Sequence, residues 1–153
     1  MDLILWRHAD AKEGTDDLPD LERPLTAKGE RQAQRMAQWL KRQLPESTRV
    51  LVSPAVRTRQ TAAALEHKVR VIEALGPDAS VGALLHATRW PEAREPVLVV
   101  GHQPTLGLAA ATLLAGAPHP WAVRKGSVWW IKHRERGGSS EVVLHAVVSP
   151  DCV

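Results

Sequence analysis

The sequence predicts an α/β fold: a three-layer α/β/α sandwich whose sheet is mostly parallel and ends in an antiparallel hairpin. Short apolar runs recur along the chain, which is typical of strands buried on both faces. Longer segments with apolar residues at helical spacing separate these runs. Two further strand-like runs flank a glycine pair near the C-terminus. The chain has 153 residues, so we expect a single domain that spans residues 1–153.

The first strand and helix are separated by a long loop. Residues 3–6 (LILW) form a short buried strand, and the polar segment 10–25, which contains two prolines, is expected to be a loop. Thr26 is a suitable helix N-cap. Apolar residues follow it at helical spacing as far as Leu44, and Pro45 ends the pattern.

A second strand–helix pair follows. Residues 50–52 (VLV) are a buried strand. Ser53 then resembles an N-cap serine, and Pro54 takes the first helical position of a helix that reaches about Glu66. A third strand is expected at residues 69–72.

The next helix–strand–helix series completes the alternation. We expect a short helix over residues 80–90. Residues 97–100 (VLVV) are the clearest buried strand of the chain. Pro104 then begins an Ala/Leu-rich helix that ends near Leu114.

The last elements are two strands over residues 127–132 and 141–148. Gly137 and Gly138 lie between them, and a glycine pair is typical of a tight hairpin turn. Alternating strands and helices predict a parallel sheet, to which this hairpin adds an antiparallel part. The sequence contains no internal repeat or linker.

Composition and charge exclude several classes of protein. The net charge of +3 comes from basic residues spread along the chain, without the block of basic and aromatic residues that marks nucleic-acid binding. No apolar run approaches the ~18 residues of a membrane span. The initial apolar run stops at Arg7 and His8, unlike a secretory signal. The only cysteine, Cys152, excludes an internal disulfide, so we expect a cytoplasmic protein.

Charged and imidazole side chains follow three of the predicted strands. Arg7 and His8 follow the first strand, Arg57 lies in the first turn after the second, and His102 follows the strand at 97–100. Ligands of open α/β sheets bind beyond the carboxyl ends of the strands. If these strands are neighbours, the four side chains converge on one small volume.

This set of side chains suits phosphoryl transfer. Two guanidinium groups can bind phosphoryl oxygens with paired N–H groups, and a helix N-terminus adds further donors. An imidazole among them can act as a nucleophile or as a proton donor or acceptor. The set contains neither a carboxylate ligand for Mg²⁺ nor a cysteine. We therefore expect a phosphohistidine intermediate, with no metal or other cofactor.

The same motifs resemble those of a known family. They are RHA at 7–9, RPLTxxG at 23–29, SPxxRxxQT at 53–61 and GH at 101–102. In this order they resemble the histidine phosphatase superfamily, also called phosphoglycerate mutase-like, and more closely its small SixA-type phosphohistidine phosphatases. The resemblance covers roughly residues 1–115. Ala9 stands where the wider superfamily usually has glycine, whereas alanine is common in the SixA-like group.

The resemblance implies a role for each matched residue. His8 is the nucleophile, which becomes phosphorylated on a ring nitrogen. Arg7, Arg57 and His102 bind the phosphoryl oxygens and stabilise the transition state. Water then hydrolyses the phosphohistidine, and no metal is needed. The resemblance implies a phosphatase that acts on phosphohistidine of a partner protein, such as a phosphotransfer domain or a histidine-kinase component.

The general acid is left open by the sequence. Glu73, which follows the third strand, lies in the region where relatives that cleave alcohol esters place an acid; Asp10 and Asp78 are weaker candidates. An imidazole leaving group, with a conjugate-acid pKa of about 6.5, needs less help than an alkoxide. A site for which the sequence identifies no definite general acid is therefore compatible with N–P cleavage.

Two alternatives remain at this stage. One is a small-molecule phosphomonoesterase of the same superfamily, for which Glu73 would be essential. The other is a catalytically silent module that only binds phosphate groups. The intact set of two arginines and two histidines disfavours the silent module. The modest length of the loop at 10–25 favours an open pocket that admits a side chain of another protein.

Overall fold

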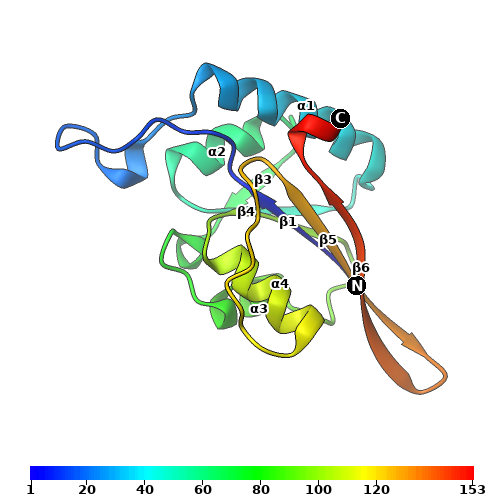
Figure 1. Cartoon of the computed structure of the whole chain (residues 1–153). Coiled ribbons are helices and arrows are strands. Elements are labelled where there is room, and N and C mark those ends of the chain that lie inside the picture. Colours follow the sequence, from blue (N-terminus) through cyan, green and yellow to red (C-terminus); the bar gives the residue numbers. More distant parts are fainter.

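The computed structural model describes all 153 residues and contains a six-stranded sheet in the order β3-β2-β4-β1-β5-β6 (Figure 1). The strands are β1 (Asp2–Arg7), β2 (Arg49–Val52), β3 (Val69–Val71), β4 (Val97–Gly101), β5 (Val128–Arg136) and β6 (Ser139–Val148). The first four strands are parallel, and β5 and β6 are antiparallel. The predicted combination of a parallel sheet and a terminal hairpin is confirmed.

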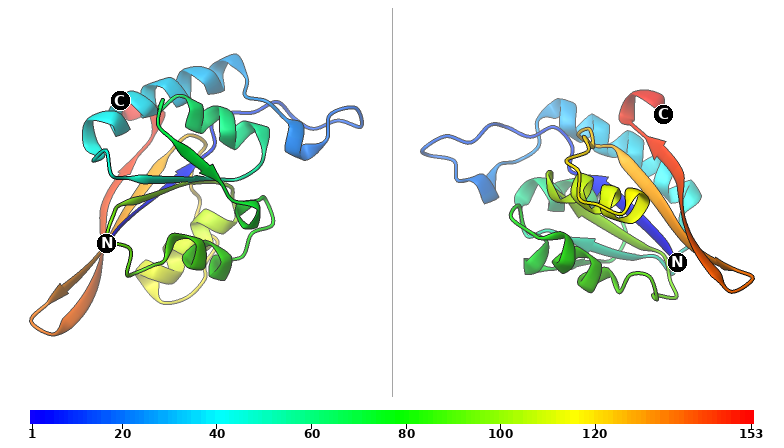
Figure 2. Two further views of the ribbon diagram at one scale, coloured as in Figure 1. Left: turned by 180° about the vertical axis from the view of Figure 1, so that it is seen from behind. Right: turned by 60° about the horizontal axis from the view of Figure 1, so that its bottom comes forward.

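Helices cover both faces of the sheet, as the three-layer prediction requires. They are α1 (Ala27–Gln43), α2 (Val56–Ala63), α3 (Val81–Thr88) and α4 (Thr105–Ala115). Helices α1 and α2 lie on one face, and α3 and α4 on the other (Figures 1 and 2). None of these helices combines the length and apolar character that crossing a bilayer requires.

Strand β1 lies between two apolar cores and belongs to both. Its residues Leu3 to Trp6 have no exposed surface. Ile4 and Trp6 pack into the core under α1 and α2, while Leu3 and Leu5 pack into the core under α3 and α4. The buried Trp6 indole donates a hydrogen bond to the Gly126 carbonyl at 3.0 Å. Because β1 is buried on both faces, its position in the sheet is fixed, and so is the position of Arg7 at its end.

The terminal hairpin is longer than the sequence pattern indicated. Strand β5 extends to Arg136 and β6 begins at Ser139, so the pair projects beyond the rest of the sheet (Figure 2). Gly137 and Gly138 form the turn with φ values of 55° and 85°. Positive φ at both central residues is typical of a two-residue hairpin turn, which confirms the predicted turn.

Helix α2 begins at Val56, two residues later than predicted, and ends at Ala63. Ala55 rather than Ser53 is its N-cap residue, and no side chain caps this helix. The expectation that Ser53 caps it is therefore wrong. The Ser53 hydroxyl instead lies 2.7 Å from the Nε2 atom of His102.

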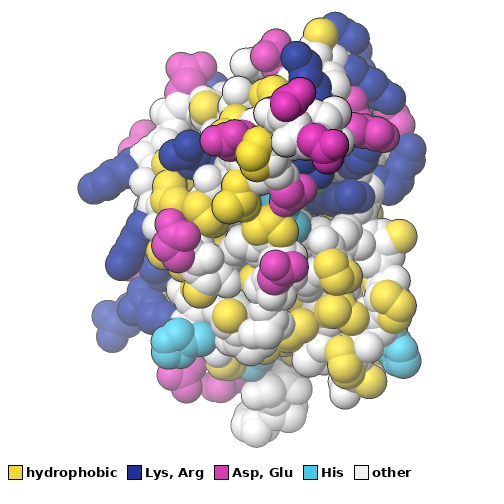
Figure 3. Space-filling model, turned by 90° about the vertical axis from the view of Figure 1, so that its left-hand side faces the viewer, with side chains coloured by type: hydrophobic (Ala, Val, Ile, Leu, Met, Phe, Trp, Pro, Cys, Tyr) yellow, Lys and Arg dark blue, Asp and Glu magenta, His cyan; other side chains and the backbone are white.

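The loop between β1 and α1 projects from the body of the protein (Figure 1). A bridge between Ala11 and Leu25 closes its base, and its outer part contains a 3-10 turn at Asp20–Glu22. On the face of the molecule toward which this loop projects, acidic and basic side chains are interspersed among apolar ones (Figure 3). This face therefore has no continuous basic surface of the kind that binds a nucleic-acid backbone.

Candidate active site

The strand order brings the predicted site residues together at the carboxyl ends of the parallel strands, which form one edge of the sheet. Strands β1 and β4 are neighbours, with Arg7 opposite Gly101. The His8 N–H donates to the Gly101 carbonyl at 3.1 Å, so the chain segments that carry the two histidines stay in contact. The imidazole rings of His8 and His102 have their centroids 5.4 Å apart.

The His8 imidazole is buried and oriented by the backbone. Its Nδ1 atom lies 2.8 Å from the Ala9 carbonyl oxygen. Because a carbonyl oxygen only accepts hydrogen bonds, Nδ1 must carry the proton, and in the neutral ring Nε2 then holds a lone pair. Burial lowers the pKa of His8 to about 4; the Ala9 hydrogen bond opposes this shift, and the charges of Arg57 and Arg7 add to it. His8 is therefore a neutral potential nucleophile at pH 7.

His102 is also buried and neutral. Its Nε2 atom contacts Ser53 Oγ at 2.7 Å, and its Nδ1 atom is buried without a hydrogen-bond partner in the protein. Burial lowers the pKa of His102 to about 3, and the nearby charge of Arg57 contributes to the shift. The site therefore contains two uncharged imidazoles beside two permanently charged guanidinium groups.

These lowered pKa values predict a specific loss of stability in acid. In the unfolded chain a histidine takes up a proton near pH 6.5, while the folded protein keeps His8 and His102 neutral until about pH 4 and about pH 3. The unfolded state thus binds more protons below pH 6.5, and stability falls as the pH falls. Between pH 7 and pH 5 we expect each imidazole to remove about 2 kcal/mol from the free energy of unfolding.

Urea unfolding at both pH values checks this prediction. Replacing His102 by glutamine removes one of the two buried imidazoles, so the drop between pH 7 and pH 5 should shrink by about 2 kcal/mol. His119→Gln replaces a histidine at an exposed position outside the site and is the matched control. Equal drops in all three proteins would contradict the buried, neutral state of His102.

Arg57 lies at 4% exposure and is held by the loop before α1. Its Nη1 donates to the Asp20 carbonyl at 2.7 Å, and its Nη2 donates to the Asp20 carboxylate at 3.2 Å. Arg23 donates to the other carboxylate oxygen at 3.0 Å. Partial burial acts to raise the pKa of Asp20, but the hydrogen bonds from both arginines outweigh it and lower the pKa. Asp20 is therefore ionised, and its carboxylate helps to orient the Arg57 side chain.

Arg7 extends from the end of β1 toward the segment before β5. Its Nη1 donates to the Val123 carbonyl at 2.9 Å. Burial lowers its pKa, and the charge of Arg57 contributes further. A guanidinium group stays protonated in proteins, so Arg7 and Arg57 together make this edge of the sheet strongly positive.

Unpartnered polar atoms are concentrated at the same edge. Five buried side-chain nitrogen or oxygen atoms have no hydrogen-bond partner: Arg7 Nε, Arg49 Nη1, Arg57 Nε, His102 Nδ1 and Ser127 Oγ. All but Arg49 Nη1 belong to this edge, because the Ser127 carbonyl accepts from the Arg7 N–H at 3.1 Å. A buried donor without a partner is costly. Several such donors together suit a bound oxyanion.

The structure does not tie Glu73 to this cluster. Glu73 begins a 3-10 turn directly after β3, the outermost strand on one side of the sheet. The Glu73 side chain is exposed and makes no hydrogen bond or ion pair. Asp10 accepts from the Thr26 hydroxyl at 2.7 Å and from Lys125 at 3.1 Å. The Thr26 hydrogen bond lowers the pKa of Asp10, which therefore holds no proton to donate at neutral pH.

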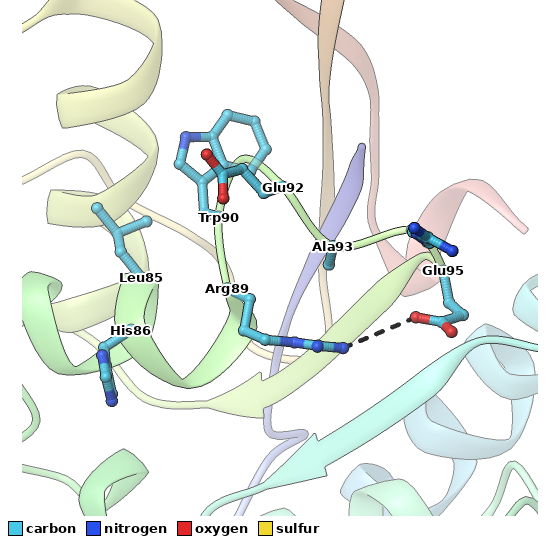
Figure 4. Close-up of a pocket in the computed structure, with 8 residues that line it drawn as sticks. Leu85, His86, Arg89, Trp90, Glu92, Ala93 and Glu95 are labelled. Carbon is cyan, nitrogen blue, oxygen red and sulfur yellow. Dashed lines mark ion pairs between the residues drawn. The ribbon is translucent and has the colours of Figure 1, made fainter.

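A separate hollow of about 470 Å³ lies along residues 85–95, beside the C-terminal end of α3 (Figure 4). It contains an ion pair between Arg89 and Glu95 at 3.8 Å and none of the predicted site residues. No group of three or more His, Cys, Asp or Glu side chains is arranged to hold a metal ion. The edge around His8 is therefore the candidate active site.

Comparison with known proteins identifies the family. Residues 3–76 match the family model described as histidine phosphatase superfamily, branch 1. Phosphohistidine phosphatase SixA from Escherichia coli K12 is 37% identical over 129 residues, which cover 78% of each chain. The chain belongs to the histidine phosphatase superfamily. An uncharacterized protein from Picosynechococcus is 35% identical over 95% of this chain and 90% of its own.

The fold of this histidine phosphatase is similar to those of solved SixA structures. A protein histidine phosphatase SixA complexed with tungstate superposes with a TM-score of 0.78 at 30% identity, over 99% of this chain and 98% of its own. A putative SixA from Nakamurella multipartitia gives 0.76 at 29% identity, over 97% and 95%. These findings confirm the predicted phosphoglycerate mutase-like fold and the SixA-like resemblance, and the protein is accordingly a phosphatase.

Two residues of the site were missed or misjudged from the sequence. Asp20 lies in a loop with several other acidic residues, and nothing distinguishes it until the fold brings it to Arg57, 37 positions later. From the sequence alone, Ser53 is expected to cap a helix because proline follows it. Its contact with His102, 49 positions later, leaves no local signal.

Proposed function

We propose that this phosphatase removes phosphate from phosphohistidine on a partner protein, through a covalent phosphoryl intermediate on His8. The observation that carries this proposal is the neutral His8 imidazole, with its Nε2 lone pair available, beside buried and unpartnered donors. A nucleophile next to positive charge suits attack on a phosphoryl dianion.

In the first step, His8 Nε2 attacks phosphorus and forms a new N–P bond. The N–P bond of the substrate breaks, and the electron pair goes to the leaving imidazole, which takes a proton from solvent water. The backbone carbonyl of Ala9 holds the proton on Nδ1 and so stabilises the positive charge that develops on the His8 ring. Arg7 and Arg57 offset the charge of the phosphoryl oxygens, and His102 supplies one more hydrogen-bond donor.

In the second step, water attacks the phosphoryl group on His8. A new O–P bond forms, the N–P bond breaks and its electron pair returns to Nε2, while the attacking water gives up a proton to the solvent. The products are inorganic phosphate and neutral His8. The pKa of about 4 favours release of His8 as the neutral ring, ready for another cycle. The net reaction is hydrolysis of phosphohistidine to histidine and phosphate.

Three observations support phosphohistidine as the substrate. The relative with 37% identity is named a phosphohistidine phosphatase. A SixA structure with 30% identity holds tungstate, an oxyanion with the shape of phosphate. Glu73 makes no contact that would hold it over the site, and an imidazole leaves without the strong acid help that an alkoxide needs.

The proposal extends to the partner and the compartment. A phosphotransfer domain or a histidine-kinase component fits best, because each carries phosphohistidine on a protein surface that an open site can admit. We propose that the reaction takes place in the cytoplasm, where the single exposed cysteine, Cys152, would stay reduced.

The Glu73→Gln variant distinguishes a phosphohistidine phosphatase from a small-molecule phosphomonoesterase. If phosphohistidine is the substrate, we expect less than about a 3-fold change in its hydrolysis, because imidazole is a good leaving group. The measurement is phosphate release from a phosphohistidine-bearing protein and from an alkyl phosphate, with Glu92→Gln as an exposed control. Faster turnover of the alkyl phosphate, with a loss of about 10²-fold or more in Glu73→Gln, would establish the phosphomonoesterase instead.

A further inference from the structure

Ser53 and His102 form a buried polar pair beside the nucleophile. Ser53 has no exposed surface and His102 has 3%. Ser53 Oγ and His102 Nε2 are 2.7 Å apart, and the Ala55 N–H donates to the same hydroxyl oxygen at 3.3 Å. Neither side chain has another hydrogen-bond partner, so the position of one proton decides what His102 offers to the site.

Only one arrangement of hydrogens satisfies the serine. A hydroxyl group has one proton to donate, and its oxygen already accepts from Ala55. If His102 Nε2 also donated to this oxygen, the Ser53 proton would be buried without an acceptor, at a cost of about 1–3 kcal/mol. If Ser53 donates to Nε2, the serine hydroxyl and His102 Nε2 are both satisfied, and only Nδ1 remains without a partner in the protein. In the neutral ring the remaining proton then lies on His102 Nδ1.

The backbone holds the Ser53 hydroxyl in this place. The Ser53 N–H donates to the Val100 carbonyl of β4 at 3.1 Å. The Thr58 hydroxyl of α2 donates to the Ser53 carbonyl at 3.0 Å. The Ser53 backbone is thus bound on both sides to the two elements that flank the site, β4 and α2, which keeps this residue beside His102.

We propose that Ser53 is a positioning residue: it donates a hydrogen bond to His102 Nε2 and so keeps the proton on Nδ1, where His102 can donate it to a phosphoryl oxygen. This inference rests on the proposed function and deepens it. In the opposite tautomer, Nδ1 would present a lone pair to the phosphoryl oxygens, and the two would repel each other. The unpartnered and buried state of Nδ1 is what such a donor requires.

Nitrogen NMR of the imidazole rings tests the tautomer directly, without any substrate turnover. We expect the ¹⁵N shifts of His102 in the wild type to show a protonated Nδ1 and a hydrogen-bonded, unprotonated Nε2 at pH 7. In Ser53→Ala the Nε2 atom loses its donor, so we expect a mixture of tautomers. Ser53→Thr keeps the hydroxyl and should retain the wild-type pattern. Thr88→Val removes another buried hydroxyl, remote in the chain, and serves as the control.

Titration with inorganic phosphate gives the second readout. We expect the His102 Nδ1–H resonance to move on phosphate binding in the wild type, and the affinity to fall about 10-fold or more in Ser53→Ala but not in Thr88→Val. Because this titration uses no phosphohistidine, a wild type that binds phosphate in this way but lacks phosphohistidine hydrolysis supports the role of Ser53 and contradicts only the proposed substrate.

Two results would overturn the inference. One is a wild-type spectrum with the proton on His102 Nε2. The other is a folded Ser53→Ala protein, judged by its melting temperature, whose His102 keeps the Nδ1–H tautomer in full. If Ser53→Ala does not fold, the wild-type spectrum alone decides between the two arrangements.

Discussion

We expect the replacement of His8 with alanine to lower the rate of phosphohistidine hydrolysis by at least about 10⁴-fold, because the variant would have no nucleophile to accept the phosphoryl group. Water attacking the substrate directly would lack the covalent intermediate that divides the reaction into two easier steps. The measurement is single-turnover phosphate release from a phosphohistidine-bearing protein. The remaining arginines should still bind inorganic phosphate, so the variant loses catalysis rather than binding.

A control variant separates this effect from general damage. His119→Ala changes an exposed histidine in the segment before β5 and should keep wild-type activity. His8 itself is 6% exposed, so the melting temperature of His8→Ala must be measured beside its activity. A folded His8→Ala protein that retains a tenth of wild-type activity would exclude His8 as the nucleophile.

We expect the replacement of Arg57 with alanine to lower kcat/KM for phosphohistidine by about 10²–10³-fold, the size of effect typical of a main oxyanion donor. The loss has two causes. The guanidinium group no longer offsets the charge on the phosphoryl oxygens. In addition, the Asp20 carboxylate, now without one of its two arginine partners, remains at the site and repels the substrate.

Three further variants check this explanation of the Arg57 effect. Arg59→Ala removes an exposed arginine two positions along the same helix and should have little effect. Arg57→Lys should restore little activity, because an ammonium group lacks the planar set of donors. Asp20→Asn combined with Arg57→Ala should recover part of the loss, since the repelling charge is gone. Equal activities of Arg57→Ala and Arg59→Ala would remove Arg57 from the site.

Local sequence patterns were sufficient for the fold. The apolar run at 3–6 is fully buried in the observed β1, and the strand predicted at 97–100 is the buried β4. The order of the strands then brings the site together. Because β1 lies beside β4 and β4 beside β2, the motifs that follow these three strands meet at the carboxyl ends of the strands. The histidine and arginine motifs could be found because each directly follows a buried strand.

Other features depend on contacts between distant residues and could not be predicted. The charged end of β5 has no strand pattern, and its pairing with β6 extends it to Arg136. Helix α2 begins at Val56, and the Ser53 hydroxyl contacts His102, which lies 49 positions later, instead of capping this helix. Asp20 gains its role only when the loop folds against Arg57. The role of Glu73 stays a prediction, since its side chain makes no hydrogen bond or ion pair in the structure.

The most direct test of the central claim is to trap the phosphoryl group on the enzyme. Wild-type protein is mixed with a ³²P-phosphohistidine protein, quenched within milliseconds at alkaline pH, and digested for mass spectrometry. We expect an acid-labile phosphoryl group on the peptide that carries His8, and none in His8→Ala. Phosphate release by the wild type with no label on the enzyme at any time, or with label only at another residue, would contradict it.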